Sequence, residues 1–258
     1  MSTLTLTPAP GAAPLPRMVL AQARMESRLL LRNGEQLLIA IVIPVIVLIG
    51  TVVGADHLHQ LRTERPIDVF APGVLGLAVM STSFTSLAIA TGFERRYGVL
   101  KWLGSSPLPR SGLLLGKVGS LLMVEVLQLV VLGGVAAAMG WHPSLDPVAV
   151  LGAVAMLVLG TAAFASLGLF VAGALRAEAT LAVANLVYLL LLAGGGVVLP
   201  TRWYGGFGHV AWLLPSGALG EGLRSALDGG GFPALATLVL VAWTALGTFL
   251  TARTFSWE

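Results

Sequence analysis

The sequence of 258 residues contains no cysteine, which excludes a disulfide framework, a cysteine nucleophile and a cysteine metal site. Charged residues are scarce at 10% of the chain, whereas an ordinary soluble domain carries about 25%. Hydrophobic residues reach 56%, and the mean hydropathy is +0.90. A soluble fold of this length could not bury so much apolar surface. The composition therefore predicts an all-α, polytopic membrane protein.

Sequence motifs for hydrolysis and for metal binding are absent as well. An intramembrane serine protease needs a nucleophilic serine in a Gly-x-Ser-Gly turn and a histidine within a span. Here Ser216 and Gly217 follow Leu214-Pro215 instead. The pair His57-x-His59 is a weak metal cue in a polar segment, and a plain loop is the simpler interpretation. We expect neither catalytic residues nor a metal site.

A nucleotide-binding loop is missing too. A phosphate-binding loop needs a glycine, four further residues and then Gly-Lys-Ser/Thr. The segment from Gly112 to Val118 is one residue short and places valine where the metal-binding hydroxyl would be. We therefore expect no cofactor on this chain, and any ATP that drives it would be hydrolysed by another chain.

Six apolar runs have about the 20 residues that a helix needs to cross a bilayer. They are residues 37–54, 69–91, 113–139, 147–175, 181–199 and 232–252. Residues 200–231 are aromatic, rich in glycine and too broken for a full span. The first 16 residues are rich in Thr, Ala and Pro, and we expect a disordered tail there. Residues 17–258 would form one transmembrane domain.

The segment Arg17 to Asn33 is predicted to form an amphipathic helix at the membrane surface. Its four arginines fall within one arc of about 80° on a helical projection, and apolar residues take much of another face. Such a helix lies in the interface, with its basic side towards lipid headgroups or a cytosolic partner. A solvated helix that merely precedes the first span is the alternative.

The basic residues predict the orientation of the chain. The net charge of +3 and the sequence pI of about 9.8 do not indicate nucleic acid binding, because the basic residues flank the apolar runs. With the termini inside, the inner segments hold 11 of the 15 Lys and Arg residues and the outer segments hold 4. We therefore expect both termini in the cytoplasm. The inner residues are Arg17, Arg24, Arg28, Arg32, Arg95, Arg96, Lys101, Arg110, Lys117, Arg176 and Arg253, and the outer ones are Arg62, Arg65, Arg202 and Arg224.

The charged loop between the second and third spans is the most informative segment. Val99, Leu100 and Leu103 share one face at helical spacing, with Tyr97 and Trp102 beside them. Gly104 and Pro107 end this short helix. One apolar and one basic side would suit a groove on a partner protein. An interfacial helix held in place by its Trp and Tyr is the alternative.

This loop resembles the inner-loop signature of the permeases of ABC type-2 exporters. The resemblance rests on Glu94-Arg95-Arg96-x-Gly98-x-Leu100-x-x-Leu103, Ser106-Pro107 and Leu115-Gly116-Lys117. The basic first helix, the six-span layout and the segment from Pro200-x-x-Trp203 to Leu214-Pro215 extend it over nearly the whole chain. Lys101 stands where an acidic residue is common in the family, and Trp102 is unusually bulky.

The resemblance implies a multi-pass permease of the cell membrane that works as a homodimer or as half of a heterodimer. Each subunit would dock onto a separate ABC ATPase, which binds ATP and Mg²⁺. The substrate would be a hydrophobic or amphipathic drug, antibiotic or lipid. The broken outer segment would form short re-entrant helices, and Glu94 would brace the second span. The docking residues would be Glu94, Arg95, Arg96, Tyr97, Gly98, Val99, Leu100, Lys101, Trp102 and Leu103.

Polar residues inside the predicted spans are candidates for the substrate path. They are Ser83, Ser86, Glu125, Gln128 and Asn185. An ionisable residue in the bilayer is costly unless it is paired, so a functional role is a reasonable hypothesis for Glu125. A hydrogen-bonded structural group is the alternative for Glu125, and close helix packing is the alternative for the hydroxyls. A stand-alone secondary transporter or a membrane-embedded enzyme remains the rival function, although paired broken helices at mid-membrane are missing.

Overall fold

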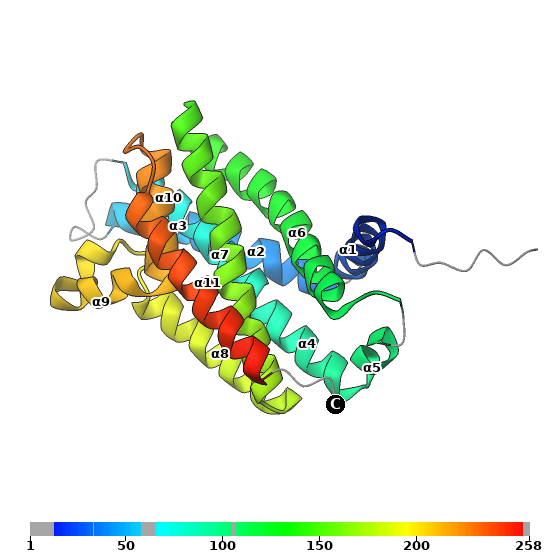
Figure 1. Cartoon of the computed structure of the whole chain (residues 1–258). Helices are drawn as coiled ribbons and strands as arrows, with labels where there is room; N and C mark the ends of the chain where they lie inside the picture. The colour runs from blue at the N-terminus through cyan, green and yellow to red at the C-terminus, as the bar shows by residue number, and fades with distance from the viewer. Residues whose placement is uncertain (1–12, 33, 58–64, 105–106, 255–258) are drawn as a thin grey trace, which may run out of the picture.

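The computed structural model describes residues 13–32, 34–57, 65–104 and 107–254, and this part of the chain is a bundle of helices without strands (Figure 1). The helices are α1 (Leu15–Arg32), α2 (Gly34–His57), α3 (Pro66–Met80), the π-helix η2 (Ser81–Ser86), α4 (Leu87–Arg96), α5 (Val99–Gly104), α6 (Arg110–Ala138), α7 (Pro147–Ala174), α8 (Ala177–Gly194), the 3₁₀-helix η3 (Thr201–Phe207), α9 (Gly208–Leu213), α10 (Pro215–Leu227) and α11 (Ala234–Thr254). The predicted all-α fold is confirmed.

Five helical segments are long and apolar enough to cross a membrane. They are Pro66–Arg96, Ser111–Ala138, Pro147–Ala174, Ala177–Gly194 and Ala234–Thr254. They correspond to the last five of the six predicted spans. The first predicted span lies in α2, which continues through Pro44, and the apolar stretch described there is the shorter Ala40–Ala55.

The helix ends follow local chemistry and shift several predicted boundaries. The Asp146 carboxylate accepts hydrogen bonds from the amides of Val148 and Ala149, each at 2.9 Å, and so caps α7 at its first turn. The fifth span begins at Ala177 rather than at 181. It ends at Gly194 rather than at 199, at the first glycine of the run Gly194-Gly195-Gly196. At the other terminus, α1 begins at Leu15.

The two ends of the bundle differ in character. α1, α5 and the turn between α7 and α8 lie at one end, which we call the basic end (Figure 1). The short helices η3, α9 and α10 lie towards the opposite end (Figure 1). α10 packs against α3 and α7, and α11 lies along α7. Phe70, Leu77 and Met80 of α3 and Phe164 of α7 are completely buried in the core between them.

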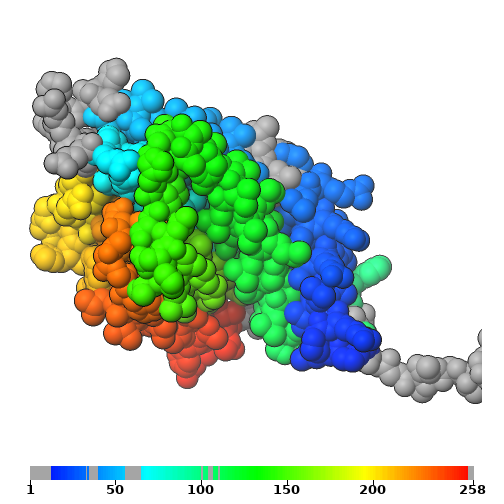
Figure 2. Space-filling view, turned by 90° about the horizontal axis from the view of Figure 1, so that it is seen from above, coloured from blue at the N-terminus to red at the C-terminus, as the bar shows by residue number. Residues whose placement is uncertain are grey.

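α1 lies along the first half of α6, at the side of the bundle (Figure 2). Gly116 of α6 makes this approach possible, because a Cβ atom there would stand 2.6 Å from the Gln22 side chain. The face of α1 that is buried carries Gln22, Ala23 and Ser27. Gly116 belongs to the segment that resembled a phosphate loop. In the structure this segment is part of α6, and α1 packs against it.

Candidate functional site

A buried polar network connects three helices, η2, α6 and α7, near their middles. The hydroxyl of Ser83, in η2, donates to the Glu125 carboxylate of α6 at 2.5 Å. The hydroxyl of Thr161, in α7, donates to the other oxygen of that carboxylate at 2.6 Å. All three side chains are almost fully buried. Glu125 is therefore partnered by neighbouring helices rather than exposed to lipid, which is how an ionisable group can be held within a span.

A second bond pair extends this network to α2. The hydroxyl of Thr82 donates to the amide oxygen of Gln128 at 3.1 Å. The amide nitrogen of Gln128 donates to the Ala40 carbonyl at 2.9 Å. Thr82 and Ser83 are adjacent in sequence, yet both bond to α6 at positions about one turn apart. Their segment is π-helical, and single π-helical turns within α-helices are frequent at functional sites.

Gly168 brings α7 close enough to complete the network. A Cβ atom at this position would lie 2.8 Å from the Phe84 carbonyl oxygen and 3.3 Å from that of Ser83. Only glycine permits this contact without displacing the backbone. The approach places Thr161, about two turns earlier on α7, beside Glu125.

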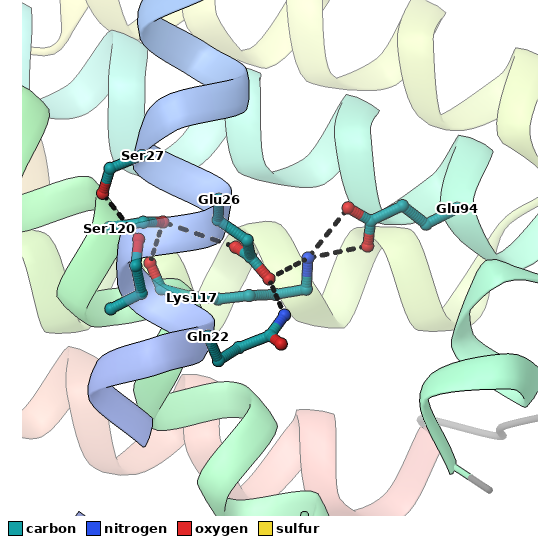
Figure 3. Close-up of polar contacts among 7 residues, drawn as sticks. Gln22, Glu26, Ser27, Glu94, Lys117 and Ser120 are labelled. Atoms are coloured by element: carbon teal, nitrogen blue, oxygen red, sulfur yellow. Dashed lines mark hydrogen bonds and ion pairs between the residues drawn. The ribbon is translucent and has the colours of Figure 1, made fainter. Parts of the chain in front are cut away.

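An ionic cluster lies nearer the basic end, between α1, α4 and α6 (Figure 3). The Lys117 ammonium donates to both oxygens of Glu94, at 2.9 and 2.7 Å. It also lies 3.3 Å from an oxygen of Glu26. Gln22 donates to that same Glu26 oxygen at 2.7 Å, and Ser120 donates to the other at 3.4 Å. The Lys117–Glu94 pair ties the second span to the third.

A partly open cavity of about 230 Å³ adjoins both polar groups. Its residues come from α1, α2, the second span and α6. The charged cluster contributes to the lining, together with Thr82 and Ser86 of η2. The full lining is Glu26, Leu29, Leu30, Ala40, Thr82, Ser86, Leu87, Ala90, Glu94, Lys117, Ser120, Leu121 and Val124.

At the basic end, the two arginines of the sequence motif contact the chain itself. Arg95 donates to the carbonyls of Gly173 and Leu175, both at 2.6 Å, and so caps the end of α7. Arg96 forms an ion pair with Glu178 of α8. The base of the second span is thereby fastened to the turn between the fourth and fifth spans.

The residues that follow these arginines form a short exposed helix. Gly98 has a φ of +73°, a backbone conformation that favours glycine, and it separates α4 from α5. Tyr97 is 72% exposed and Trp102 is 83% exposed. The side chain of Leu100 lies outside the described part, whereas Leu103 is half-buried. The predicted helix is present as α5, with Trp102 exposed on it and Tyr97 exposed just before it.

The sequence-predicted site residues do not all meet. Ser83, Glu125 and Gln128 belong to the buried network, and Ser86 lines the cavity. Asn185 stands apart, because it is exposed on the surface of α8. Sequence reasoning missed Glu26 and Thr161. It counted Lys117 only as a basic residue of the inner segments, whereas the structure buries it to 2% exposure. The available signal was that Lys117 lies within the apolar run 113–139, where a charged side chain needs a partner.

The sequence of this chain can now be compared with those of known protein families. Residues 17–228 match the sequence model of the family described as ABC-2 type transporter. The chain belongs to this family. No curated protein gives a significant match. This ABC-2 chain is therefore a multi-pass membrane protein and a permease component of an ABC transporter, and the family implies an ATPase partner.

The network around Glu125 predicts how this ABC-2 permease responds to substitution there. A glutamine at 125 can still accept from Ser83 through its oxygen and can donate to Thr161 through its nitrogen. We expect Glu125→Gln to fold, assemble with the ATPase and transport normally. Glu125→Ala leaves a cavity and takes away the hydrogen-bond partner of the Ser83 hydroxyl, whereas Thr161 keeps its bond to the Leu157 carbonyl. This variant should lower the free energy of unfolding by about 2–3 kcal/mol. Thermal unfolding and transport assays of both variants measure this difference. A Gln variant that hydrolyses ATP but exports nothing would show that the ionised carboxylate acts on substrate.

Proposed function

We propose that this chain is the permease subunit of an ABC exporter that moves a hydrophobic or amphipathic molecule, such as a drug, an antibiotic or a lipid, out of the cytoplasm. The observation that carries the proposal is α5, a short helix at the basic end of the bundle that carries the exposed Trp102 and follows the exposed Tyr97 at the end of α4. An exposed helix of this kind can fill a groove on the ATPase. The ATPase supplies the ATP and Mg²⁺ site, and this permease binds no cofactor of its own.

The coupling segment, residues 94–103, is connected to the spans in a way that supports this role. Its first residue is bonded to Lys117 on the third span, and the next two contact the turn between α7 and α8. A displacement of α5 by the ATPase would therefore act on four spans, the second to the fifth. Rigid elements joined by such contacts are what conformational coupling between distant sites requires.

An exposed amide within a span supports the dimeric state. Asn185 lies on the surface of α8, beside the exposed Leu181, Leu186 and Leu189. A polar amide that faces lipid is unfavourable, but across a helix–helix interface it can bond to a second chain. We propose that α8 contributes to the contact between two permease subunits, identical or different.

The decisive experiment is reconstitution with an ABC ATPase. An ABC ATPase should be co-expressed with this chain, and the complex should be purified through a tag on the permease. The proposal expects a stable complex whose ATP hydrolysis exceeds that of the ATPase alone and which exports a substrate from vesicles. A permease that purifies in folded form without any ATPase, and that transports with an ion gradient alone, would contradict it.

Orientation can be tested cleanly because the sequence has no cysteine to give background labelling. We propose that the basic end and both termini face the cytoplasm of a cell whose plasma membrane holds the permease, and that η3, α9 and α10 form a re-entrant segment on the outside. A cysteine at Arg202 should react with an impermeant maleimide in intact cells. A cysteine at Arg96 should react only after the cells are opened. Labelling of the Arg96→Cys variant in intact cells would reverse the proposed orientation.

A further inference from the structure

The cavity of about 230 Å³ between α1, α2, the second span and α6 has two different polar ends. The cluster of Glu26, Glu94 and Lys117 forms one end. Thr82 and Ser86 form the other. At roughly 1.5 Å per residue, Thr82 lies about 18 Å along the helix from Glu94. The cavity therefore extends from the basic end of the bundle towards its middle, where it reaches the bonds around Gln128.

The walls between these ends are apolar. Leu29 and Leu30 come from α1, Leu87 and Ala90 from α4, and Leu121 and Val124 from α6. A long apolar wall with polar groups confined to its ends is suited to an amphipathic guest, which buries its apolar part along the wall and satisfies its polar part at one end.

The charges at the basic end are unbalanced. Two carboxylates share a single ammonium group, so the cluster carries a net charge of −1 when all three groups are ionised. The exposed arginines of α1 do not restore the balance, because none of them lines the cavity. A buried negative charge without a full partner is unfavourable, and a cation close to it would relieve that cost.

Within the cluster, the ammonium group is more deeply buried than the two carboxylates. The Lys117 side chain is only 3% exposed, whereas the side chains of Glu26 and Glu94 are 14% and 27% exposed. Each carboxylate oxygen can accept more than one hydrogen bond. Lys117 lines the cavity as well, but its side chain is almost fully buried, so a guest in the cavity meets mainly carboxylate oxygens.

We propose that this cavity binds a lipophilic organic monocation, with its positive group at Glu26 and Glu94 and its apolar part along the wall formed by α1, α4 and α6. This inference rests on the proposed function, because it names the substrate class of the exporter and the place where that substrate first binds. An anionic guest would meet the two carboxylates. A neutral guest would leave the charge of the cluster uncompensated.

Binding of a matched pair of probes to the purified full-length permease tests the proposal. Phenethyltrimethylammonium carries the charge, and neohexylbenzene has the same shape with carbon in place of nitrogen. Equilibrium dialysis with the radiolabelled cation, in a non-ionic maltoside, should show saturable binding to one site. The neutral compound should compete at least about tenfold more weakly, as expected for the loss of one close charge pair. Equal competition by the neutral compound would overturn the proposal without the need for any variant.

Three substitutions locate the site. Glu26→Gln makes the cluster neutral while Lys117 keeps both bonds to Glu94, and it should weaken cation binding at least about tenfold. Ala90→Leu fills the cavity and should weaken both probes. Glu178→Gln removes an exposed carboxylate that does not line the cavity, and cation affinity should stay unchanged. Cation binding that survives both Glu26→Gln and Ala90→Leu would overturn the proposed site.

Failure of the cation-binding proposal can be distinguished from failure of the proposed function. Complex formation with the ATPase and its basal ATP hydrolysis depend on α5, which does not line the cavity. A permease that assembles and stimulates its ATPase but shows no preference for the cation would retain the proposed function and refute this inference. A permease that binds the cation selectively but recruits no ATPase would refute the function and retain the site.

Discussion

Replacing Arg224 with alanine should lower the free energy of unfolding by about 3–5 kcal/mol, which makes it the most destabilising single substitution that we expect. The guanidinium of Arg224, in α10, is buried among backbone carbonyls from two other segments. Its Nε donates to the Val69 carbonyl of α3 at 3.0 Å. One terminal nitrogen donates to the carbonyls of Val197 and Val198 at 2.7 and 2.5 Å.

The carbonyls of Val197 and Val198 lie between the end of α8 and the start of η3, so no helical amide is available to bond to them. The other terminal nitrogen of Arg224 donates to the Gly196 carbonyl at 3.4 Å and lies 3.5 Å from Glu221. Alanine would leave buried acceptors unsatisfied and a carboxylate with one partner fewer. Each unsatisfied buried group costs about 1–3 kcal/mol, which accounts for the size of the predicted effect.

Arg202→Ala is the matched control, because Arg202 lies in the same broken segment but is exposed. It should change the unfolding free energy by no more than about 0.5 kcal/mol. Arg224→Lys should recover little, because an ammonium cannot form the fork-shaped set of bonds that the guanidinium makes. Thermal unfolding of the three variants in detergent gives the comparison. An Arg224→Ala protein as stable as Arg202→Ala would show that the outer helices are held by apolar packing alone.

Apolar run length predicted the spans well because lipid imposes it. A helix of about 20 apolar residues satisfies every backbone group internally, whatever its neighbours are. Five of the six runs correspond to candidate spans of the structure. Among these five, the differences lie at helix ends such as Gly194, where turn geometry determines the boundary rather than hydropathy.

The polar contacts could not be predicted from the same pattern. Lys117 and Arg224 were counted among the basic residues of the inner and outer segments, yet both are buried and bonded to distant segments. Their partners depend on which helices lie side by side, and a single sequence does not contain that information. For Glu125, its position within a span indicated that the carboxyl group would be costly unless paired, and the structure pairs it with Ser83 of the second span and Thr161 of the fourth. Thr161 was not foreseen, because its approach depends on Gly168.

Replacing Trp102 with glutamate should weaken binding of the ATPase at least about thirtyfold and abolish the stimulation of its ATP hydrolysis. Trp102 is the most exposed of the large hydrophobic side chains described in the chain. An exposed tryptophan that enters a pocket on a partner commonly contributes 2 kcal/mol or more to binding, which corresponds to about thirtyfold. A carboxylate at the same place would also have to be buried without a partner.

The isolated variant should remain as stable as the parent, because an exposed side chain contributes little to the fold. Phe207→Glu supplies the control: Phe207 is a 50% exposed aromatic residue in η3, towards the opposite end of the bundle. It should leave ATPase binding unchanged, because the proposed orientation puts it outside the cell. Affinity for the ATPase, measured by titration of the purified subunits, and the rate of ATP hydrolysis distinguish the two substitutions. Equal loss of binding in both variants would mean that glutamate disturbs the fold, and an intact complex with Trp102→Glu would remove α5 from the interface.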